Sequence, residues 1–243
     1  MKEKVNSVCS KVQFLSGAQL KLTAILSMLI DHVNKALIYP NLVSNNGILT
    51  TVSNIFDILG RIAFPLFCFM LVEGFFKTRN RKKYLLNLLI FGVISEVPFD
   101  MFTTASFFNT NWNNVMFTLA LVLITIWSID ILKGKMQKLP KALWYFVSLL
   151  IVLIMCIVAM FLALDYEHHA ILMGYFFYLF HDMRVFSILF GYASMYTQPW
   201  SLLGFGLTLT YNGQRGKQNK WLTYWFYPAH LLILGILRLS LGI

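Results

Sequence analysis

The sequence predicts an all-α polytopic membrane protein, with about nine transmembrane helices in one bundle and the N-terminus in the cytosol. Of its 243 residues, 58% are hydrophobic and 12% are charged, whereas soluble domains contain about half hydrophobic and about a quarter charged residues. Apolar stretches of about 20 residues, the length at which a helix crosses the hydrocarbon core, recur along the chain. The alternating pattern of a membrane β-barrel is absent, and three cysteines without metal-ligand spacing indicate neither a disulfide scaffold nor a metal site.

The apolar segments divide the chain into nine predicted helices. Clear spans cover residues 20–39, 55–76, 84–102, 115–132, 142–164 and 221–239. Residues 166–180, 185–197 and 199–211 form shorter segments, and two of them would leave eight spans if they formed a re-entrant pair. Residues 1–19 are polar and are expected to be a short cytosolic tail, followed by a single transmembrane domain over residues 20–243.

The basic residues fall on one side of this predicted topology. The chain has 20 lysines and arginines but only 10 acidic residues. With the N-terminus inside, all basic residues except Lys35, Arg61 and Arg238 lie in the tail or in cytosolic loops. Cytosolic loops of multi-pass proteins carry this excess of lysine and arginine. We therefore expect a multi-pass membrane protein whose N-terminus lies in the cytosol.

The first span contains a candidate general base. Ionisable side chains inside a span are costly, so each is a candidate functional residue. Lys21 and His32 share a helix face and lie roughly 16 Å apart, which places Lys21 at the cytosolic interface and His32 past the midplane. A neutral imidazole there can act as a base; alternatively, it is a packed polar side chain. Asp31 points about 100° away, and it would orient another residue or pair with Lys35 at i+4.

Further ionisable residues lie in the second and last spans. Asp57 and Arg61 are one helix turn apart, so they form either a structural ion pair or a site in which Arg61 stabilises an oxyanion. Glu73 ends the second span beside a basic run and is a candidate substrate contact or a partner for that run. His230 follows Pro228 in the last span and is a candidate substrate contact.

A polar group is predicted at the outer ends of the helices. Glu96 and Asp100 share a face of the third span, and Pro98 between them is expected to break the helix. With Asn114 and Asp165, these carboxylates would bind a cationic or hydroxylated acceptor. The alternative is ordinary polarity at helix ends.

Two cytosolic segments are more basic than topology requires. The first contains Lys77, Arg79, Arg81 and Lys82, and the second contains Arg215 and Lys217 between glycines. Arginine suits bidentate phosphate contacts, so these segments indicate a phosphorylated cytosolic ligand or anionic lipid headgroups. Nucleic acid is not expected, because the runs are short and juxtamembrane.

Several segments together resemble the TraX family of membrane proteins. They are residues 21–32 (KLTAILSMLIDH), 60–65 (GRIAFP), 71–75 (LVEGF), 78–85 (TRNRKKYL), 95–100 (SEVPFD), 114–119 (NVMFTL), 165–166 (DY), 211–216 (YNGQRG) and 226–231 (FYPAHL). The founding member of that family is associated with N-acetylation of conjugative pilin. The Lys21–His32 spacing also looks like the first-helix motif of the wider transmembrane acyltransferases, although Arg79 and Arg81 stand one residue closer than their Arg-x-x-Arg pair.

The resemblance implies a transmembrane acetyltransferase. Cytosolic acetyl-CoA would be held by Lys21 and the two basic segments, and His32 would deprotonate an amine or hydroxyl of an exported peptide, pilin or surface glycan at the outer face. The alternatives from other classes are a proton-coupled transporter and a non-enzymatic membrane assembly factor. No metal is expected.

Overall fold

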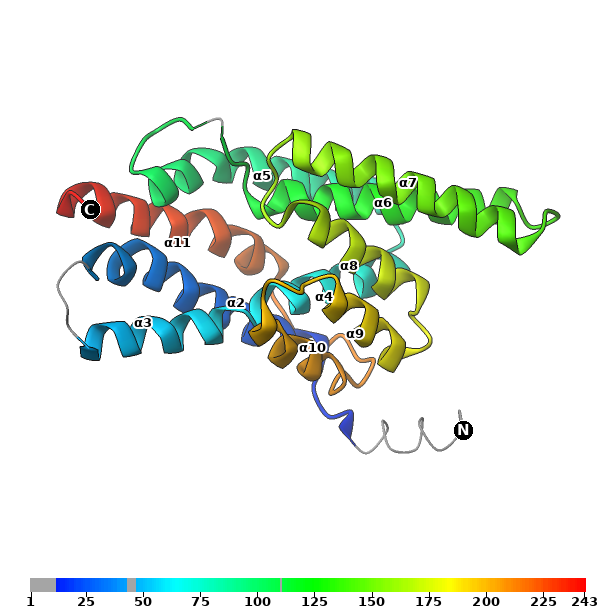
Figure 1. The fold of residues 1–243 in the computed structure, drawn as a ribbon, viewed down its shortest axis with the longest axis horizontal. Coiled ribbons are helices and arrows are strands. Elements are labelled where there is room, and N and C mark those ends of the chain that lie inside the picture. The colour runs from blue at the N-terminus through cyan, green and yellow to red at the C-terminus, as the bar shows by residue number, and fades with distance from the viewer. Residues whose placement is uncertain (1–11, 43–46, 110) are drawn as a thin grey trace. The chain divides into compact units, whose positions relative to one another are not determined.

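The computed structural model describes residues 12–42, 47–109 and 111–243, and these residues are almost entirely helical (Figure 1). Two isolated β-bridges are the only strand-like pairings within this part of the chain. The α-helices are α2 (Gly17–Val33), α3 (Gly47–Gly60), α4 (Ala63–Lys77), α5 (Arg81–Thr104), α6 (Val115–Lys135), α7 (Lys141–Phe161), α8 (Glu167–Leu179), α9 (Arg184–Ala193), α10 (Leu202–Thr208) and α11 (Lys220–Leu241). A π-helical turn (Asn34–Ile38) and a 3-10 turn (Tyr39–Asn41) extend α2, and a 3-10 turn (Pro199–Ser201) precedes α10.

Five helical stretches in the described residues are long and apolar enough to cross a membrane. They are Gly47–Lys77, Arg81–Thr104, Val115–Lys135, Lys141–Phe161 and Thr223–Leu241. This finding supports a multi-pass helical protein, but it is fewer than the nine spans expected from the sequence. The segments expected at 166–180, 185–197 and 199–211 contain helices of 13, 10 and 7 residues. At 1.5 Å per residue these helices are about 20 Å long or shorter, less than the roughly 30 Å hydrocarbon core.

The expected helix break at Pro98 is wrong. Helix α5 continues through Pro98 to Thr104. Proline removes one backbone hydrogen bond, but a complete break in an apolar environment would leave several backbone groups without partners. The helix is therefore the better way to satisfy this backbone.

The described chain forms two compact units. Unit 1 contains residues up to Met70 together with Val97–Asn109 and Tyr196–Ile243, and unit 2 contains Leu71–Glu96 and Thr110–Met195. The tail lysines Lys2, Lys4 and Lys11 and the loop at 43–46 lie outside the described residues.

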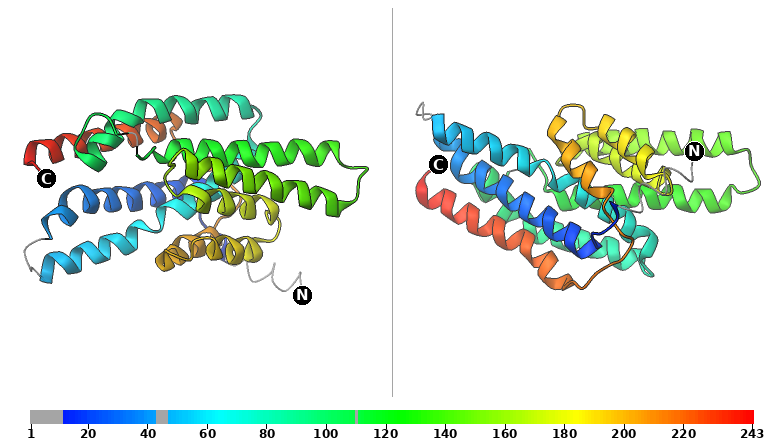
Figure 2. Two further views of the ribbon diagram at one scale, coloured as in Figure 1. Left: turned by 45° about the horizontal axis from the view of Figure 1, so that its top comes forward. Right: turned by 90° about the horizontal axis from the view of Figure 1, so that it is seen from below.

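Unit 1 is built on α2, which packs against α3 and α11 (Figures 1 and 2). Ser16 caps α2: its side chain accepts from the Gln19 N–H, and the Gln19 side chain accepts from the Ser16 N–H in a capping box. Leu20 and Ala24 are fully buried along α2, and Leu231 of α11 is fully buried as well. This packing places the polar side chains of Ser27 and Asp31 in the interior of the unit.

Unit 2 is built on the antiparallel α6–α7 hairpin, against which α8 packs (Figure 2). Asn114 caps α6 by accepting from the Met116 N–H. Gly174 of α8 allows the close approach, because a Cβ there would lie 2.2 Å from Val122 Cγ1 of α6. Val122, Ile126 and Ile129 of α6 are fully buried.

Candidate functional site

The second basic segment lies against the start of α2 in unit 1. The N–H groups of Gly17 and Ala18 donate to the carbonyls of Gln214 (2.8 Å) and Arg215 (2.9 Å). Gly216 has a φ of +71° and a Cβ there would lie 2.7 Å from Ser16 Oγ, so this contact requires glycine. The arrangement brings Arg215 and Lys217 to the helix end that carries Lys21. The first N–H groups of an α-helix have no partner within the helix, and here two of them donate to the carbonyls of Gln214 and Arg215. An anion at this end would therefore have to be held by side chains.

A partly buried pair of histidines in unit 1 comes from α2 and α11. His32 Nδ1 lies 2.7 Å from His230 Nε2, and the two rings are stacked with centroids 5.0 Å apart. His230 Nδ1 lies 2.7 Å from the carbonyl oxygen of Phe226. His230 is 6% exposed, and the Phe102 ring lies 4.8 Å from the His32 ring.

These contacts assign the protons of the two rings when both are neutral. A carbonyl oxygen only accepts, so His230 carries its proton on Nδ1 and its Nε2 accepts. His32 Nδ1 must then be the donor of the pair, which leaves Nε2 of His32 as the basic nitrogen. The sequence predicted His32 as the base and His230 separately as a substrate contact; the structure brings the two side chains together.

Asp31 is held beside this pair by two features. Its Oδ2 accepts from Lys35 Nζ at 2.6 Å, which confirms the i+4 pairing expected from the sequence. Gly60 of α3 lies directly against it, since a Cβ at Gly60 would be 2.5 Å from Asp31 Cβ. Asp31 Oδ1 is buried and has no hydrogen-bond partner among the described residues. Within the described residues no hydrogen bond joins Asp31 to His32, in agreement with its different helix face.

Asp57 and Arg61 form the expected ion pair, because Arg61 Nη2 donates to Asp57 Oδ1. The pair lies where α3 ends, and Ser27 Oγ of α2 donates to the carbonyl of Leu59 at 2.6 Å in the same region. The structure thus shows the structural alternative for this pair; an oxyanion role for Arg61 stays a prediction.

Asp100 lies in the part of α5 that belongs to unit 1. It is 2% exposed, and its Oδ2 accepts from the Asn109 N–H at 3.0 Å. Its Oδ1 is buried and has no partner among the described residues. Arg238 of α11 donates to the carbonyls of Phe102 and Thr103 at 2.6 Å each, which ties α11 to the end of α5.

In unit 2, the first residue of the first basic segment, Lys77, is engaged in an ion pair. Lys77 Nζ pairs with Glu73 Oε2 at 2.8 Å, and His181 Nε2 lies 3.1 Å from Glu73 Oε1. The hydrogen bond to Glu73 raises the pKa of His181 above its ordinary value. Glu73 is thus the centre of an ion-pair cluster, as the sequence allowed, and the partner His181 was missed.

Arg81 is also engaged. Its Nη1 lies 2.7 Å from Asp130 Oδ2, and its guanidinium lies 4.0 Å from the centroid of the Phe75 ring. Tyr178 donates to Asp130 Oδ1 at 3.0 Å. Asp130 and Tyr178 were not predicted as site residues, and no local spacing links them to Arg81. Arg79 and Lys82 are exposed, so these two remain the open cations of the run for a phosphate ligand.

These contacts place the basic loops of unit 2 at one end of its helices. Arg81–Asp130 joins the start of α5 to the end of α6, and Glu73–His181 joins the end of α4 to the end of α8. The topology predicted from the sequence also places these basic loops on one side of the membrane. Which end faces the cytosol stays a prediction.

The opposite end of unit 2 holds three of the predicted acceptor contacts. Asn114 Nδ2 donates to Glu96 Oε2 and to the carbonyl of Gly92. Thr118 Oγ1 donates to the Asp165 carbonyl at 2.7 Å. Tyr166 and Glu167, which follow Asp165, have left-handed φ values of 63° and 41°. Asn114 thus caps α6 and ties it to α5, and an acceptor role for this group stays a prediction.

Comparison with known proteins identifies the family. The chain matches the family described as TraX protein over residues 16–238. It is 30% identical over 244 residues to a protein of Dichelobacter nodosus named probable fimbrial assembly protein FimC, serogroup H1, covering 90% of this chain and 94% of that protein. No solved structure matches the chain. The matched range includes both histidines, both basic segments and the five candidate spans except the last three residues of Thr223–Leu241, and the chain belongs to the TraX family.

Proposed function

We propose that the protein is a membrane-embedded acetyltransferase that moves an acetyl group from acetyl-CoA to an amine or hydroxyl of an exported acceptor. The observation that carries this proposal is the hydrogen-bonded His32–His230 pair inside unit 1. An imidazole with one fixed proton and one basic nitrogen is the group that general-base catalysis of acyl transfer needs.

In the proposed reaction, Nε2 of His32 takes the proton of the acceptor N–H or O–H as the acceptor attacks the thioester carbon. A new bond forms between the acceptor atom and the acyl carbon, and the carbon–sulfur bond breaks. The proton on His32 then passes to the departing thiolate, so the pair returns to its starting state. His230 acts as a positioning residue, because its Nε2 holds the Nδ1–H of His32 and thereby directs the basic nitrogen.

The donor is proposed to enter from the end of unit 1 that carries Lys21, Arg215 and Lys217. The carbonyls of Gln214 and Arg215 cover two N–H groups of α2, so the phosphates would contact these three side chains. Lys21 and His32 are eleven residues apart on α2, roughly 16 Å along the axis. An extended acyl arm laid along this helix would bring its thioester toward the histidine pair.

The acceptor is proposed to be a fimbrial or pilin subunit. This choice depends on the name of the Dichelobacter nodosus relative, a probable fimbrial assembly protein. In unit 1, the buried Asp100 Oδ1 has no partner among the described residues and would bind an amine of the acceptor.

The test is transfer of isotopically labelled acetyl from acetyl-CoA to envelope proteins by the purified protein in lipid nanodiscs. We expect His32→Ala to lower the rate about 10²- to 10⁴-fold, the usual contribution of a general base. Lys135→Ala, a change at the exposed end of α6, serves as the control and is expected to leave the rate unchanged. Unaltered transfer by a folded His32→Ala protein would overturn the mechanism.

A second candidate is a non-enzymatic assembly factor, which the relative's name favours equally well. It predicts that fimbriae assemble normally when His32 is replaced and the protein remains folded and inserted. Fimbriation of cells that carry His32→Ala, measured together with acetyl transfer, separates the two functions. Loss of both supports the enzyme, and retained fimbriation without any acetyl transfer by the wild-type protein supports the assembly factor.

A further inference from the structure

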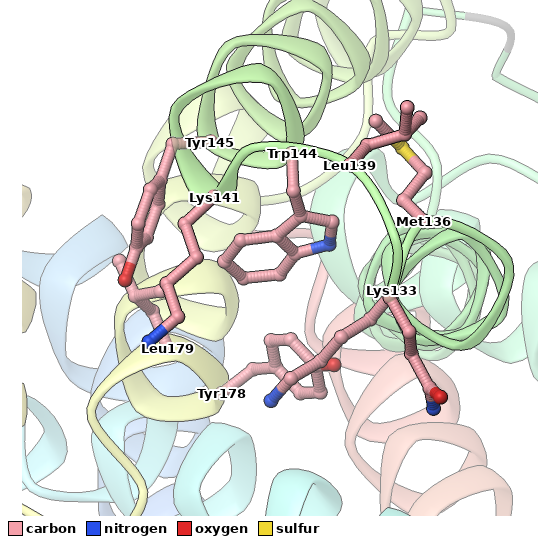
Figure 3. Close-up of a pocket in the computed structure, with 9 residues that line it drawn as sticks. Lys133, Met136, Leu139, Lys141, Trp144, Tyr145, Tyr178 and Leu179 are labelled. Carbon is pink, nitrogen blue, oxygen red and sulfur yellow. The ribbon is translucent and has the colours of Figure 1, made fainter.

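A pocket in unit 2 lies at the turn between α6 and α7, away from the residues used above for catalysis (Figure 3). Its volume is about 470 Å³, within the range of small-molecule sites, roughly 300–1,000 Å³. Two lysines, Lys133 and Lys141, and three aromatic residues, Trp144, Tyr145 and Tyr178, line it. Cations and aromatic rings around one cavity suit a ligand that has both a negative charge and a flat ring.

One aromatic wall is rigidly held. The Tyr178 hydroxyl donates to Asp130 Oδ1 at 3.0 Å, and Asp130 in turn is paired with Arg81 at 2.7 Å. The Tyr178 ring stacks on Phe76 with centroids 5.6 Å apart and an interplanar angle of 2°. The position of this ring is therefore set before any ligand binds, which lowers the ordering cost of stacking on it.

The other wall is Trp144, in the first turn of α7. Lys133 Nζ lies 5.6 Å from the centroid of the Trp144 ring, so a lysine already lies beside the indole. The indole N–H of Trp144 is buried and has no hydrogen-bond partner among the described residues. In Figure 3 the Trp144, Tyr178 and Lys133 side chains extend into the same region.

The two pocket lysines differ from the cations of the first basic segment. Lys77 and Arg81 are neutralised by Glu73 and Asp130. No carboxylate of the described residues pairs with Lys133 or Lys141. An anion in this pocket would therefore meet uncompensated positive charge.

We propose that this pocket binds a soluble purine nucleotide. The base stacks against the Trp144 and Tyr178 rings, and the phosphates contact the ammonium groups of Lys133 and Lys141. An anionic lipid headgroup shares the phosphate but has no flat ring for the aromatic walls, so the aromatic lining favours the nucleotide. The proposal does not depend on the acetyltransferase function, because none of these residues belongs to the histidine site.

The test is equilibrium binding of radiolabelled ADP to the full-length protein in nanodiscs of uncharged phosphatidylcholine. We expect the Lys133→Ala/Lys141→Ala protein to bind ADP at least about tenfold more weakly. The matched control is Lys135→Ala/Lys138→Ala, which removes the same charge from the same turn at positions that do not line the pocket. This control is expected to change binding by less than about twofold.

A second pair of variants tests the aromatic wall. Trp144→Ala should weaken ADP binding about tenfold, since stacking of a base on an aromatic ring contributes roughly 1–3 kcal/mol. Phe146→Ala, two residues along α7 and outside the pocket lining, is the control and should bind ADP as the wild type does. Unlabelled adenosine and inorganic phosphate should each compete less well than ADP, because each supplies half of the contacts.

Three results would overturn the proposal. The first is an equal loss of ADP binding in the two double-lysine variants, which would mean that only surface charge attracts the ligand. The second is unchanged binding by folded Trp144→Ala protein. The third is absence of ADP binding in phosphatidylcholine together with enrichment of phosphatidylglycerol around the wild-type but not the Lys133→Ala/Lys141→Ala protein, which would identify a lipid headgroup site.

Discussion

The histidine pair of unit 1 and the carboxylate clusters of unit 2 hold their polar side chains in opposite ways. In unit 1, His32 and His230 bond to each other and to a backbone carbonyl, and within the described residues no carboxylate joins this hydrogen-bond chain. In unit 2, Glu73 and Asp130 each accept from a cation and from a second side chain. The first arrangement leaves a basic nitrogen available, whereas the second satisfies its charges internally.

This difference separates chemistry from architecture. A buried ion pair that bonds to further partners is costly to disturb and so is suited to joining helices. A neutral imidazole pair with one nitrogen unused is suited to proton transfer. In the functions proposed above, catalysis belongs to unit 1, whereas the unit 2 clusters hold helix ends and one wall of the proposed nucleotide pocket.

The largest expected effect is on the rate of acetyl transfer when the hydrogen bond between His32 and His230 is removed. His230→Ala leaves the His32 Nδ1–H without its acceptor, and we expect acetyl transfer to slow about 10- to 100-fold, the effect of an unsatisfied buried donor. His230→Gln offers a carbonyl oxygen as a new acceptor and should recover part of the rate through kcat. The measurement is steady-state transfer in nanodiscs; equal activity of the Ala and Gln variants would contradict the positioning role.

The contact between Gly60 and Asp31 in unit 1 should be the next most sensitive. Gly60→Ala places a Cβ 2.5 Å from Asp31 Cβ, so we expect a loss of about 1–3 kcal/mol in the free energy of unfolding. Gly134→Ala in unit 2 is the control, because a Cβ there meets no atom within 4 Å. It should not lower stability, and the higher helix propensity of alanine should raise the free energy of unfolding by up to about 1 kcal/mol. Denaturant titration in detergent micelles measures both, and similar losses would show that the Gly60 contact is not specific.

The Asp130 cluster of unit 2 should show coupling between its members. Asp130→Ala removes the partner of Arg81 and of Tyr178, and we expect a loss of about 1–2 kcal/mol of stability. Tyr178→Phe alone should cost less, since the ring stays stacked on Phe76. In the double variant the two losses should not add, because Asp130→Ala has already removed the bond that Tyr178→Phe deletes. Full additivity in a double-mutant cycle would mean that the cluster is not one unit.

The smallest effect should be a pH dependence of unit 2. The hydrogen bond to Glu73 raises the pKa of His181 in the folded protein. A raised folded pKa contributes stability that is complete below the unfolded value, about 6.5, and is lost as the pH rises through the folded value. The thermal midpoint should therefore fall modestly from pH 6 to pH 9. His181→Gln should make that fall smaller, and an unchanged slope would argue against the His181–Glu73 bond.

The comparison also shows which contacts could be predicted. Three ion pairs join residues that are four positions apart in the chain, each pair in a different helical segment: Asp31–Lys35, Asp57–Arg61 and Glu73–Lys77. Each of these pairings was one of the alternatives that the sequence left open, because helical periodicity alone brings such side chains together. The predicted helix ends and lengths were less accurate. Helix α5 continues through Pro98, where a break was predicted, and α8 to α10 are too short to be the predicted spans.

The contacts that define the sites could not be predicted in the same way. His32 and His230 are separated by 198 residues, Arg81 and Asp130 by 49, and Glu73 and His181 by 108. Each of these contacts depends on which faces two helices turn toward each other. The orientation of each helix depends on the packing of many side chains, and it cannot be predicted from the spacing of residues along the chain.

By itself, the sequence determined the helical, membrane-type composition, the approximate positions of the long apolar helices and the local pairings within them, because these depend on residue type and on a period of 3.6 residues. It also made His32 a candidate base, which stays a prediction. Only the tertiary structure decided that His230 holds His32, that Asp130 and Glu73 neutralise Arg81 and Lys77, and that Lys133 and Lys141 share a pocket with Trp144. These facts arise from contacts between distant segments, which form only when apolar helix faces are buried against one another.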